Sequence, residues 1–293
     1  MDKKLEFKCV SDNLEEIPDS VKESTGLNFP EAHTKSEYMA TLSKALKENK
    51  GDLLCRLPFC NTVEAEAMGA HIKLGDFKTG PRVAKYKFNS VEELESIEEI
   101  DLQKGRIKEV LDAVELLSKQ GENVVLNIEG PFTIISSLID SMIFYKAIRK
   151  NKEAVDKFIK VVEESIVKYA EEGIKRGAKI LSYGDPVGAL DIVGPKVYKE
   201  VSAKSTMRIL RALEEKTGDV VVHLCGKTSC AFENMGFSES ERIEYDKEKT
   251  YGEGMFNILK DRKDIKFLGH GCIKRTPLKL KDNGVYKIIL KEV

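Results

Sequence analysis

Several features that would place this 293-residue chain in a special class are missing from it. Its 48 basic and 49 acidic side chains nearly cancel and are interspersed, so there is no basic arm or acidic tail to suggest wholesale nucleic-acid binding. No apolar run approaches the ~20 residues needed to cross a bilayer. The first residues show no apolar core of a signal peptide. We therefore expect a cytoplasmic protein that binds neither nucleic acid nor membrane.

The glycine-rich motifs of nucleotide-binding sheets are also absent. Neither G-x-G-x-x-G nor G-x-x-x-x-G-K-[ST] opens any of the expected helices, which argues against a nucleotide-binding doubly wound sheet. Disulfides are not expected either, because the six cysteines occur in a long chain without a secretion signal. Metal or redox use of some of these cysteines is favoured instead.

Strand-like and helix-like segments alternate along most of the chain. Such alternation predicts a mostly parallel sheet with right-handed crossovers. Without a nucleotide motif, the favoured closed form is a (β/α)8 TIM-type barrel, whose active residues lie at the carboxyl ends of the strands. The expected strands are 52–57, 83–88, 123–128, 179–183, 219–224 and 266–269, the last of the series, and the expected helices are 106–119, 152–176 and 195–216.

The domain organisation follows from the same pattern. Residues 1–45 are expected to form a partly helical N-terminal extension that caps one mouth of the barrel. Residues 46–293 are expected to form the barrel itself as a single domain.

Three residues carry the strongest chemical signal. His223, Cys225 and Cys272 each follow an apolar run that is typical of a buried strand. Residues i and i+2 of a strand share a face, so His223 and Cys225 can bind one ion, and Cys272 would reach it from a second strand end. Three such ligands with an open fourth position make a reactive zinc site rather than a structural one.

Other interpretations of these residues stay open. A strand histidine or a free cysteine is often an ordinary core residue. His270 is a rival ligand to Cys272, and Cys230 is a rival to Cys225. Cys9 and Cys55 are expected to be packing residues.

Charge counting favours sulfur chemistry at such a site. Zn²⁺ with two thiolates and a neutral imidazole has no formal charge, so an added thiolate stays electron-rich and nucleophilic. A three-histidine site keeps its +2 charge and is better suited to making hydroxide. The ligand set therefore predicts alkyl transfer to sulfur and not hydrolysis.

At this point the sequence resembles a known family. The segments that carry the resemblance are, in order, 57–70 (LPFCNTVEAEAMGA), 129–132 (EGPF), 185–186 (DP), 223–226 (HLCG) and 269–277 (GHGCIKRTP). They are similar to the uroporphyrinogen decarboxylase superfamily, and more closely to its methylcobamide:coenzyme M methyltransferase branch.

The resemblance implies a (β/α)8 barrel and zinc bound by His223, Cys225 and Cys272. It also implies a zinc-dependent methyltransferase that moves a methyl group from protein-bound methylcobalamin, a methylated corrinoid, to a thiol such as coenzyme M. The implied partners are a corrinoid protein and a small thiol. The span from Cys225 to Cys272 is short for the family, which predicts one trimmed or missing βα unit.

Acidic residues at other strand ends are the remaining candidates. Asp185, before a proline, is expected to orient His223 or to act as a transient fourth ligand, with a turn-forming aspartate as the alternative. Glu129 is ambiguous in a similar way. Glu64 and Glu66 lie two apart in an expected helix and so point different ways; one should be solvated, and the resemblance places Glu66 near the barrel mouth as a catalytic residue.

Three rival functions are weighed against methyl transfer. A tetrapyrrole decarboxylase would need arginines for the substrate's acidic groups, and only Arg56, Arg82 and Arg106 lie near the early motifs. The block 57–62 also lacks the catalytic aspartate that the resemblance would require for decarboxylation. The second rival is a corrinoid-linked demethylase component, and the third is a corrinoid- or metal-binding regulator without turnover.

Overall fold

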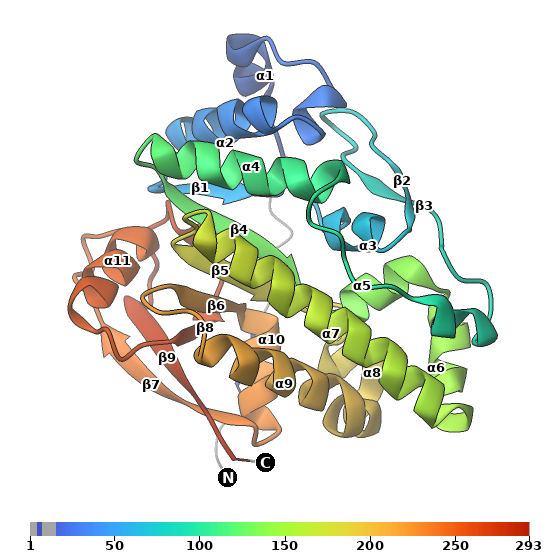
Figure 1. Cartoon of the computed structure of the whole chain (residues 1–293). Coiled ribbons are helices and arrows are strands. Elements are labelled where there is room, and N and C mark those ends of the chain that lie inside the picture. Colours follow the sequence, from blue (N-terminus) through green and yellow to red (C-terminus); the bar gives the residue numbers. More distant parts are fainter. Residues whose placement is uncertain (1–4, 8–15, 293) are drawn as a thin grey trace.

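A seven-stranded sheet forms the centre of the computed structural model, which describes residues 5–7 and 16–292 (Figure 1). Five neighbouring strands are parallel, and two antiparallel strands extend the sheet at one end. In spatial order the strands are β1 (Leu54–Leu57), β4 (Asn123–Glu129), β5 (Ile180–Gly184), β6 (Val221–Cys225), β8 (Phe267–Gly271), β9 (Gly284–Leu290) and β7 (Ser238–Glu244).

Helices cover one face of this sheet in a layer. They are α2 (Ser36–Lys50), α4 (Gly105–Lys119), α7 (Lys152–Lys175) and α9 (Ala203–Glu214) (Figure 1). Their apolar side chains recur at helical spacing, as in α4, where Ile107, Val110, Leu111 and Val114 are buried. This layer packs on alternate strand residues and forms the larger hydrophobic core.

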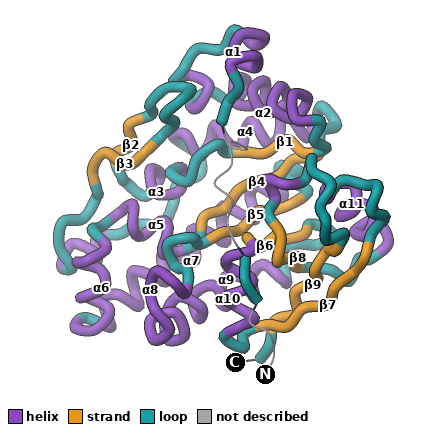
Figure 2. The backbone as a smooth tube through the Cα atoms, turned by 180° about the vertical axis from the view of Figure 1, so that it is seen from behind, coloured by secondary structure: helices purple, strands orange, loops and turns teal. Residues whose placement is uncertain are grey.

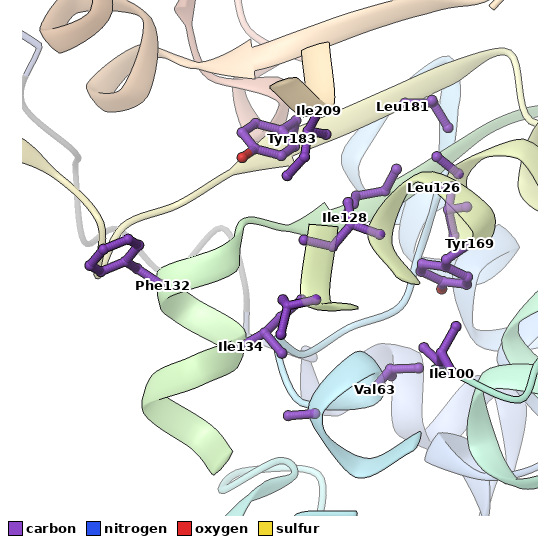
Figure 3. Packing of buried hydrophobic residues seen from close by; sticks show 14 of the residues in the cluster. Val63, Ile100, Leu126, Ile128, Phe132, Ile134, Tyr169, Leu181, Tyr183 and Ile209 are labelled. Carbon is purple, nitrogen blue, oxygen red and sulfur yellow. The ribbon is translucent and has the colours of Figure 1, made fainter. Parts of the chain in front are cut away.

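The strands carry apolar side chains on both faces, as expected for a sheet that is covered on both sides. In β4, Leu126 and Ile128 lie close to Tyr169 of α7 in the larger core (Figure 3). Val125, next to Leu126 in the strand, belongs to a second core on the opposite face. That second core is completed by α11 (Tyr251–Asp261), which begins with a capping box made by Thr250 and Glu253.

Shorter elements lie around the sheet. The helices are α1 (Asp19–Thr25), α3 (Val63–Ala67), α5 (Pro131–Leu138), α6 (Ser141–Lys150), α8 (Leu190–Val197), α10 (Gly226–Asn234) and the short turns η2 (Glu31–His33), η3 (Glu92–Ser96), η4 (Tyr198–Ser202) and η5 (Ile273–Arg275). A separate two-stranded hairpin contains β2 (His71–Lys73) and β3 (Arg82–Lys85).

The predicted α/β class with a parallel sheet is confirmed, but closure into an eight-stranded barrel is not. Figure 2 shows the strands following one another from β1 to β7, and within the described residues these two strands are the ends of the order. The expected strand at 83–88 lies in the hairpin instead of the central sheet. The expectation that 266–269 is the last strand is wrong, because β9 follows it. The connection from β8 to β9 contains no crossover helix, so β9 returns antiparallel.

The expected boundary between residues 45 and 46 falls inside α2, which packs against β1 and α4. Near the other end of the sheet, residues 5–7 lie against α10. The Asn234 side chain accepts a hydrogen bond from the Leu5 backbone at 2.9 Å and donates one to it at 2.8 Å. The division of the chain at that boundary stays a prediction.

In the part of the chain that the structure describes, no single helix is both long and apolar enough to cross a bilayer. The pair α5 and α6 would pass by length and composition together, but the two helices meet at 112°.

Candidate functional site at the carboxyl ends of β6 and β8

His223 is buried inside the second core. It shares a strand face with Val221, which packs in that core, and its side chain is only 1% exposed. Its Nε2 lies 2.9 Å from the Tyr251 hydroxyl oxygen, whereas its Nδ1 is buried without a hydrogen-bond partner. Burial lowers the pKa of His223 to about 4, so the ring is neutral at physiological pH.

The two predicted cysteine ligands come together at the same edge of the sheet. Cys225 ends β6 and pairs in register with Gly271, so Cys272 follows directly beside it. Between the pairs His223–Leu268 and Cys225–Gly271, β8 has one residue more than β6, and this extra residue forms a bulge. His270 in this bulge has φ 55°, a left-handed conformation that is uncommon for a residue with a Cβ.

These residues fit zinc in kind, although they are not gathered into a ready-made cluster. Across residues 5–7 and 16–292, no group of three or more His, Cys, Asp or Glu side chains is placed to hold a metal ion. The donor set is nevertheless one that zinc uses, and His223 has a buried nitrogen that lacks a partner. Zinc binding therefore stays a prediction, and it requires the side chains of Cys225 and Cys272 to approach His223.

The rival ligands His270 and Cys230 are hydrogen-bonded to one another. Cys230 Sγ lies 3.3 Å from His270 Nδ1, and Glu233 Oε2 lies 2.8 Å from His270 Nε2. Both ring nitrogens of His270 are thus engaged by α10. Burial raises the pKa of Cys230 to about 11, which keeps its thiol protonated. Cys55 is fully buried, as expected of a packing residue, and Cys9 lies outside the described residues.

Asp185 follows β5 and binds the start of α5. Its carboxylate accepts hydrogen bonds from the backbone N–H groups of Phe132 at 3.1 Å and Thr133 at 2.8 Å, and from the Thr133 hydroxyl at 2.8 Å. Gly130 permits this approach, since a Cβ there would lie 2.3 Å from the Asp185 Cβ. In this arrangement Asp185 holds the β4–α5 turn and does not contact Nδ1 of His223, which has no partner.

Glu66 lies in α3, beyond the end of β1, and its partner is Arg106. The Arg106 Nε donates to Glu66 at 2.5 Å, while its other nitrogens donate to Thr62 Oγ1 at 2.7 Å and to Cys60 Sγ at 3.1 Å. The Arg106 side chain is 4% exposed, against 33% for Glu66. The structure places Glu66 in this network. Its helix follows β1, and two strands, β4 and β5, separate β1 from β6, the strand that carries His223.

Glu64 is buried, so it is not the solvated member of the pair; Glu66, with a side chain 33% exposed, is the more accessible of the two. Its Oε1 accepts a hydrogen bond from the Glu129 backbone N–H at 3.0 Å, and its Oε2 has no partner. Burial raises the pKa of Glu64 to about 7. Burial, followed by the nearby Glu64 and Asp185, also holds the pKa of Glu129 well above its usual range. The carboxyl groups of Glu64, in α3, and of Glu129, at the end of β4, therefore retain protons more strongly than free carboxyls do.

Arg56 was considered from the sequence only as an arginine that a decarboxylase could use, and Tyr251 was not a candidate. Arg56 is on the same strand face as Leu54, which packs in the second core, and its side chain is 16% exposed. Asp52, at 4.0 Å, and Cys272 are the groups that face its charge, and burial lowers its pKa. A lone charge inside the apolar run LLCRLPF was an available signal for Arg56. The helix start that contains Tyr251 carries no comparable signal.

The fold and these residues define a class of protein. A parallel sheet in an α/β fold whose strands end at a histidine, two cysteines and several carboxyls is typical of an enzyme with its site at the carboxyl edge. A family model described as "Uroporphyrinogen decarboxylase (URO-D)" matches residues 15–274. The chain belongs to this family.

Individual relatives agree with the branch that the motifs resemble. The methylcobamide:CoM methyltransferase MtbA of Methanosarcina acetivorans is 29% identical over 246 residues, which cover 81% of this chain and 71% of the relative. The methylcobamide:CoM methyltransferase MtaA of Methanosarcina barkeri is 31% identical over 232 residues, covering 75% and 67%. The solved structure of a methyltransferase from Methanosarcina mazei matches with a TM-score of 0.65 and 28% identity, covering 74% of this chain and 64% of that one. The resemblance to the methylcobamide:coenzyme M methyltransferase branch is confirmed.

Proposed function

We propose that this protein transfers a methyl group from a methylated corrinoid to a small thiol. The observation that carries the proposal is the placement of His223, Cys225 and Cys272 at the ends of two paired strands. Support comes from relatives whose names describe methylcobamide:CoM methyltransferases. In the reaction the thiol sulfur gains a bond to the methyl carbon, the cobalt–carbon electron pair stays on the corrinoid, and the S–H proton is released.

The three residues would hold zinc, which supplies, when bound, the positive charge that keeps an acceptor sulfur deprotonated at neutral pH. His223 contributes a neutral imidazole because burial keeps it unprotonated. Cys225 and Cys272 would contribute two negative charges that balance the charge of Zn²⁺. The loaded site would then have no net charge and would leave the acceptor sulfur electron-rich. The chain's own task is to hold the acceptor in line with the methyl group.

Arg56 favours an acceptor thiol that also carries an acidic group. Its guanidinium is largely withdrawn from solvent, and Cys272 is among the groups that face it. Its ion-pair partner among residues 5–7 and 16–292 is Asp52, at the long distance of 4.0 Å. A sulfonate such as that of coenzyme M would provide a second, closer anion. This supports coenzyme M or a thiol of the same charge as acceptor.

The other predicted catalytic residues would act by positioning. Asp185 fixes the turn between β4 and α5 through its bonds to Phe132 and Thr133. Glu66 fixes Arg106 at the end of β1. A corrinoid protein as the methyl donor's carrier, a cytoplasmic location, and the absence of nucleic-acid and membrane binding all remain part of the proposal.

The test combines metal analysis with a spectral assay on the full chain. Protein purified under reducing, chelator-free conditions should contain about one zinc per chain. Cys225→Ser and Cys272→Ser should lose it, whereas Cys230→Ser, at the rival position, should keep it. A metal-free wild type would refute the zinc site.

The activity is followed as thiol-dependent loss of the methylcobalamin spectrum, with 2-mercaptoethanesulfonate as acceptor. The wild type should demethylate the corrinoid, and Cys225→Ser should not. Loss of carboxyl groups from added uroporphyrinogen, without methyl transfer, would instead establish the decarboxylase. Methyl transfer onto cobalt from an ether or amine would establish the demethylase, and zinc without any turnover would establish the regulator.

A further inference from the structure

Tyr251 reaches the candidate zinc ligand from the opposite side of the second core. Its side chain is 1% exposed, and its hydroxyl oxygen lies 2.9 Å from His223 Nε2. The two rings meet edge to face, with centroids 6.0 Å apart and an interplanar angle of 78°. Tyr251 is therefore the residue that engages one of the two ring nitrogens of His223.

Fixed backbone elements hold Tyr251 in this position. Its N–H donates to the Leu278 carbonyl at 2.8 Å, and the next residue, Gly252, donates to the Thr276 carbonyl at 2.9 Å. The hydroxyl also lies tightly against β8, since a Cβ on Gly271 would come within 2.5 Å of it. The phenol is thus wedged between β6 and β8, where rotation away from His223 has little room.

The other ring nitrogen of His223 is left without a partner. Nδ1 is buried and makes no hydrogen bond. A buried N–H in that situation would lose its hydration without compensation, whereas a lone pair loses less and remains available to a ligand. A histidine that binds a metal usually donates its second ring N–H to an acceptor, which fixes the tautomer and the ring plane.

We propose that Tyr251 is a positioning residue for His223: its phenol oxygen accepts the Nε2–H hydrogen bond and directs the Nδ1 lone pair toward the ligand site. The assignment of the ligand as zinc rests on the proposed function. The orientation of the ring by Tyr251 does not, because it is a property of the metal-free protein.

The second core contains a matched control. Tyr245 packs in the same core and is 8% exposed, but its hydroxyl has no hydrogen-bond partner. Tyr251→Phe and Tyr245→Phe each remove one buried phenolic oxygen and keep the aromatic ring. Only the first removes a contact with His223.

The first readout is the tautomer of His223 in the metal-free full chain, measured by long-range ¹H–¹⁵N correlation spectra. The chain has four histidines, so a His223→Gln spectrum assigns the signal. Wild type and Tyr245→Phe should show the Nε2–H tautomer, and Tyr251→Phe should show a mixture. An unchanged tautomer in Tyr251→Phe would overturn the proposal.

The second readout is zinc affinity, measured by competition with a chromophoric chelator. Tyr251→Phe should bind zinc about 10- to 100-fold more weakly than wild type, and Tyr245→Phe should match wild type. Equal affinity in wild type and Tyr251→Phe would overturn the positioning role. A wild type that binds no zinc would defeat the proposed function, and the tautomer measurement would still decide the role of Tyr251.

Discussion

Thr276 donates its hydroxyl hydrogen to the Asp52 carboxylate across 2.8 Å, joining two buried residues that are 224 positions apart. Asp52 lies just before β1, the parallel strand at one end of the sheet. Thr276 follows β8, the last of the parallel strands in the order. The segment after β8 therefore reaches back to the start of β1, the first of the parallel strands. A loop contact bridges the two sides where a closed barrel would pair strands.

This bridge should contribute to stability. Thr276→Val removes the donor and leaves the buried Asp52 with one fewer partner, so we expect the free energy of unfolding to fall by about 1–3 kcal/mol. Urea unfolding curves measure it. Thr41→Val, at an exposed site in α2, is the control and should change stability by less than about 0.5 kcal/mol. Equal stability of Thr276→Val and wild type would show that the bridge is energetically neutral.

Glu64 should make the protein less stable as the pH rises. Between about pH 4.5 and about pH 7 the unfolded chain releases the Glu64 proton while the folded chain keeps it, because the folded pKa is raised to about 7. Glu64→Gln keeps an acceptor for the Glu129 N–H and cannot ionise. We expect it to stabilise the fold at pH 8 by about 1–3 kcal/mol and to have no stabilising effect near pH 4.

Glu66→Gln is the matched control for that experiment, two residues away in the same helix. It removes the charge that pairs with Arg106, so it should destabilise the fold at pH 8. Denaturation of both variants at several pH values separates the two effects. A pH-independent difference between Glu64→Gln and wild type would contradict the buried, protonated carboxyl.

Arg56 should discriminate between acceptor thiols by charge. If its guanidinium binds the acidic group, Arg56→Gln should raise KM for 2-mercaptoethanesulfonate about 10-fold or more. The KM for uncharged 2-mercaptoethanol should change much less. Arg82→Gln, in the exposed hairpin, should affect neither thiol. Equal changes for both thiols in Arg56→Gln would exclude a charge-based role.

Cys230 and Cys55 should resist alkylation in the folded protein. Burial raises the pKa of each thiol to about 11, so only about one molecule in 10³ carries the reactive thiolate at pH 8. Timed iodoacetamide labelling followed by peptide mass spectrometry should show that both thiols are alkylated far more slowly in the folded protein than in urea. Rapid labelling of Cys230 at pH 8 would mean instead that His270 accepts its proton.

Much of the parallel sheet could be predicted from local sequence. The runs at 123–128, 179–183 and 219–224 match β4, β5 and β6 to within two residues, because buried parallel strands need apolar side chains on both faces. The strand β7 was missed because it lies at the edge of the sheet and is rich in charged and polar residues. Its partner β9 shows a strand-like apolar pattern, but nothing local says that it runs antiparallel.

The sequence by itself determined the donor types and the strand ends on which they lie. His223, Cys225 and Cys272 follow apolar runs, and parallel strands bring such ends to one edge of the sheet. Only the tertiary structure decided which groups meet there: Tyr251 against His223, His270 turned to α10, and Glu64 buried beside Glu129. These contacts depend on the order of the strands, one bulge in β8 and the packing of α11, and each joins residues far apart in the chain.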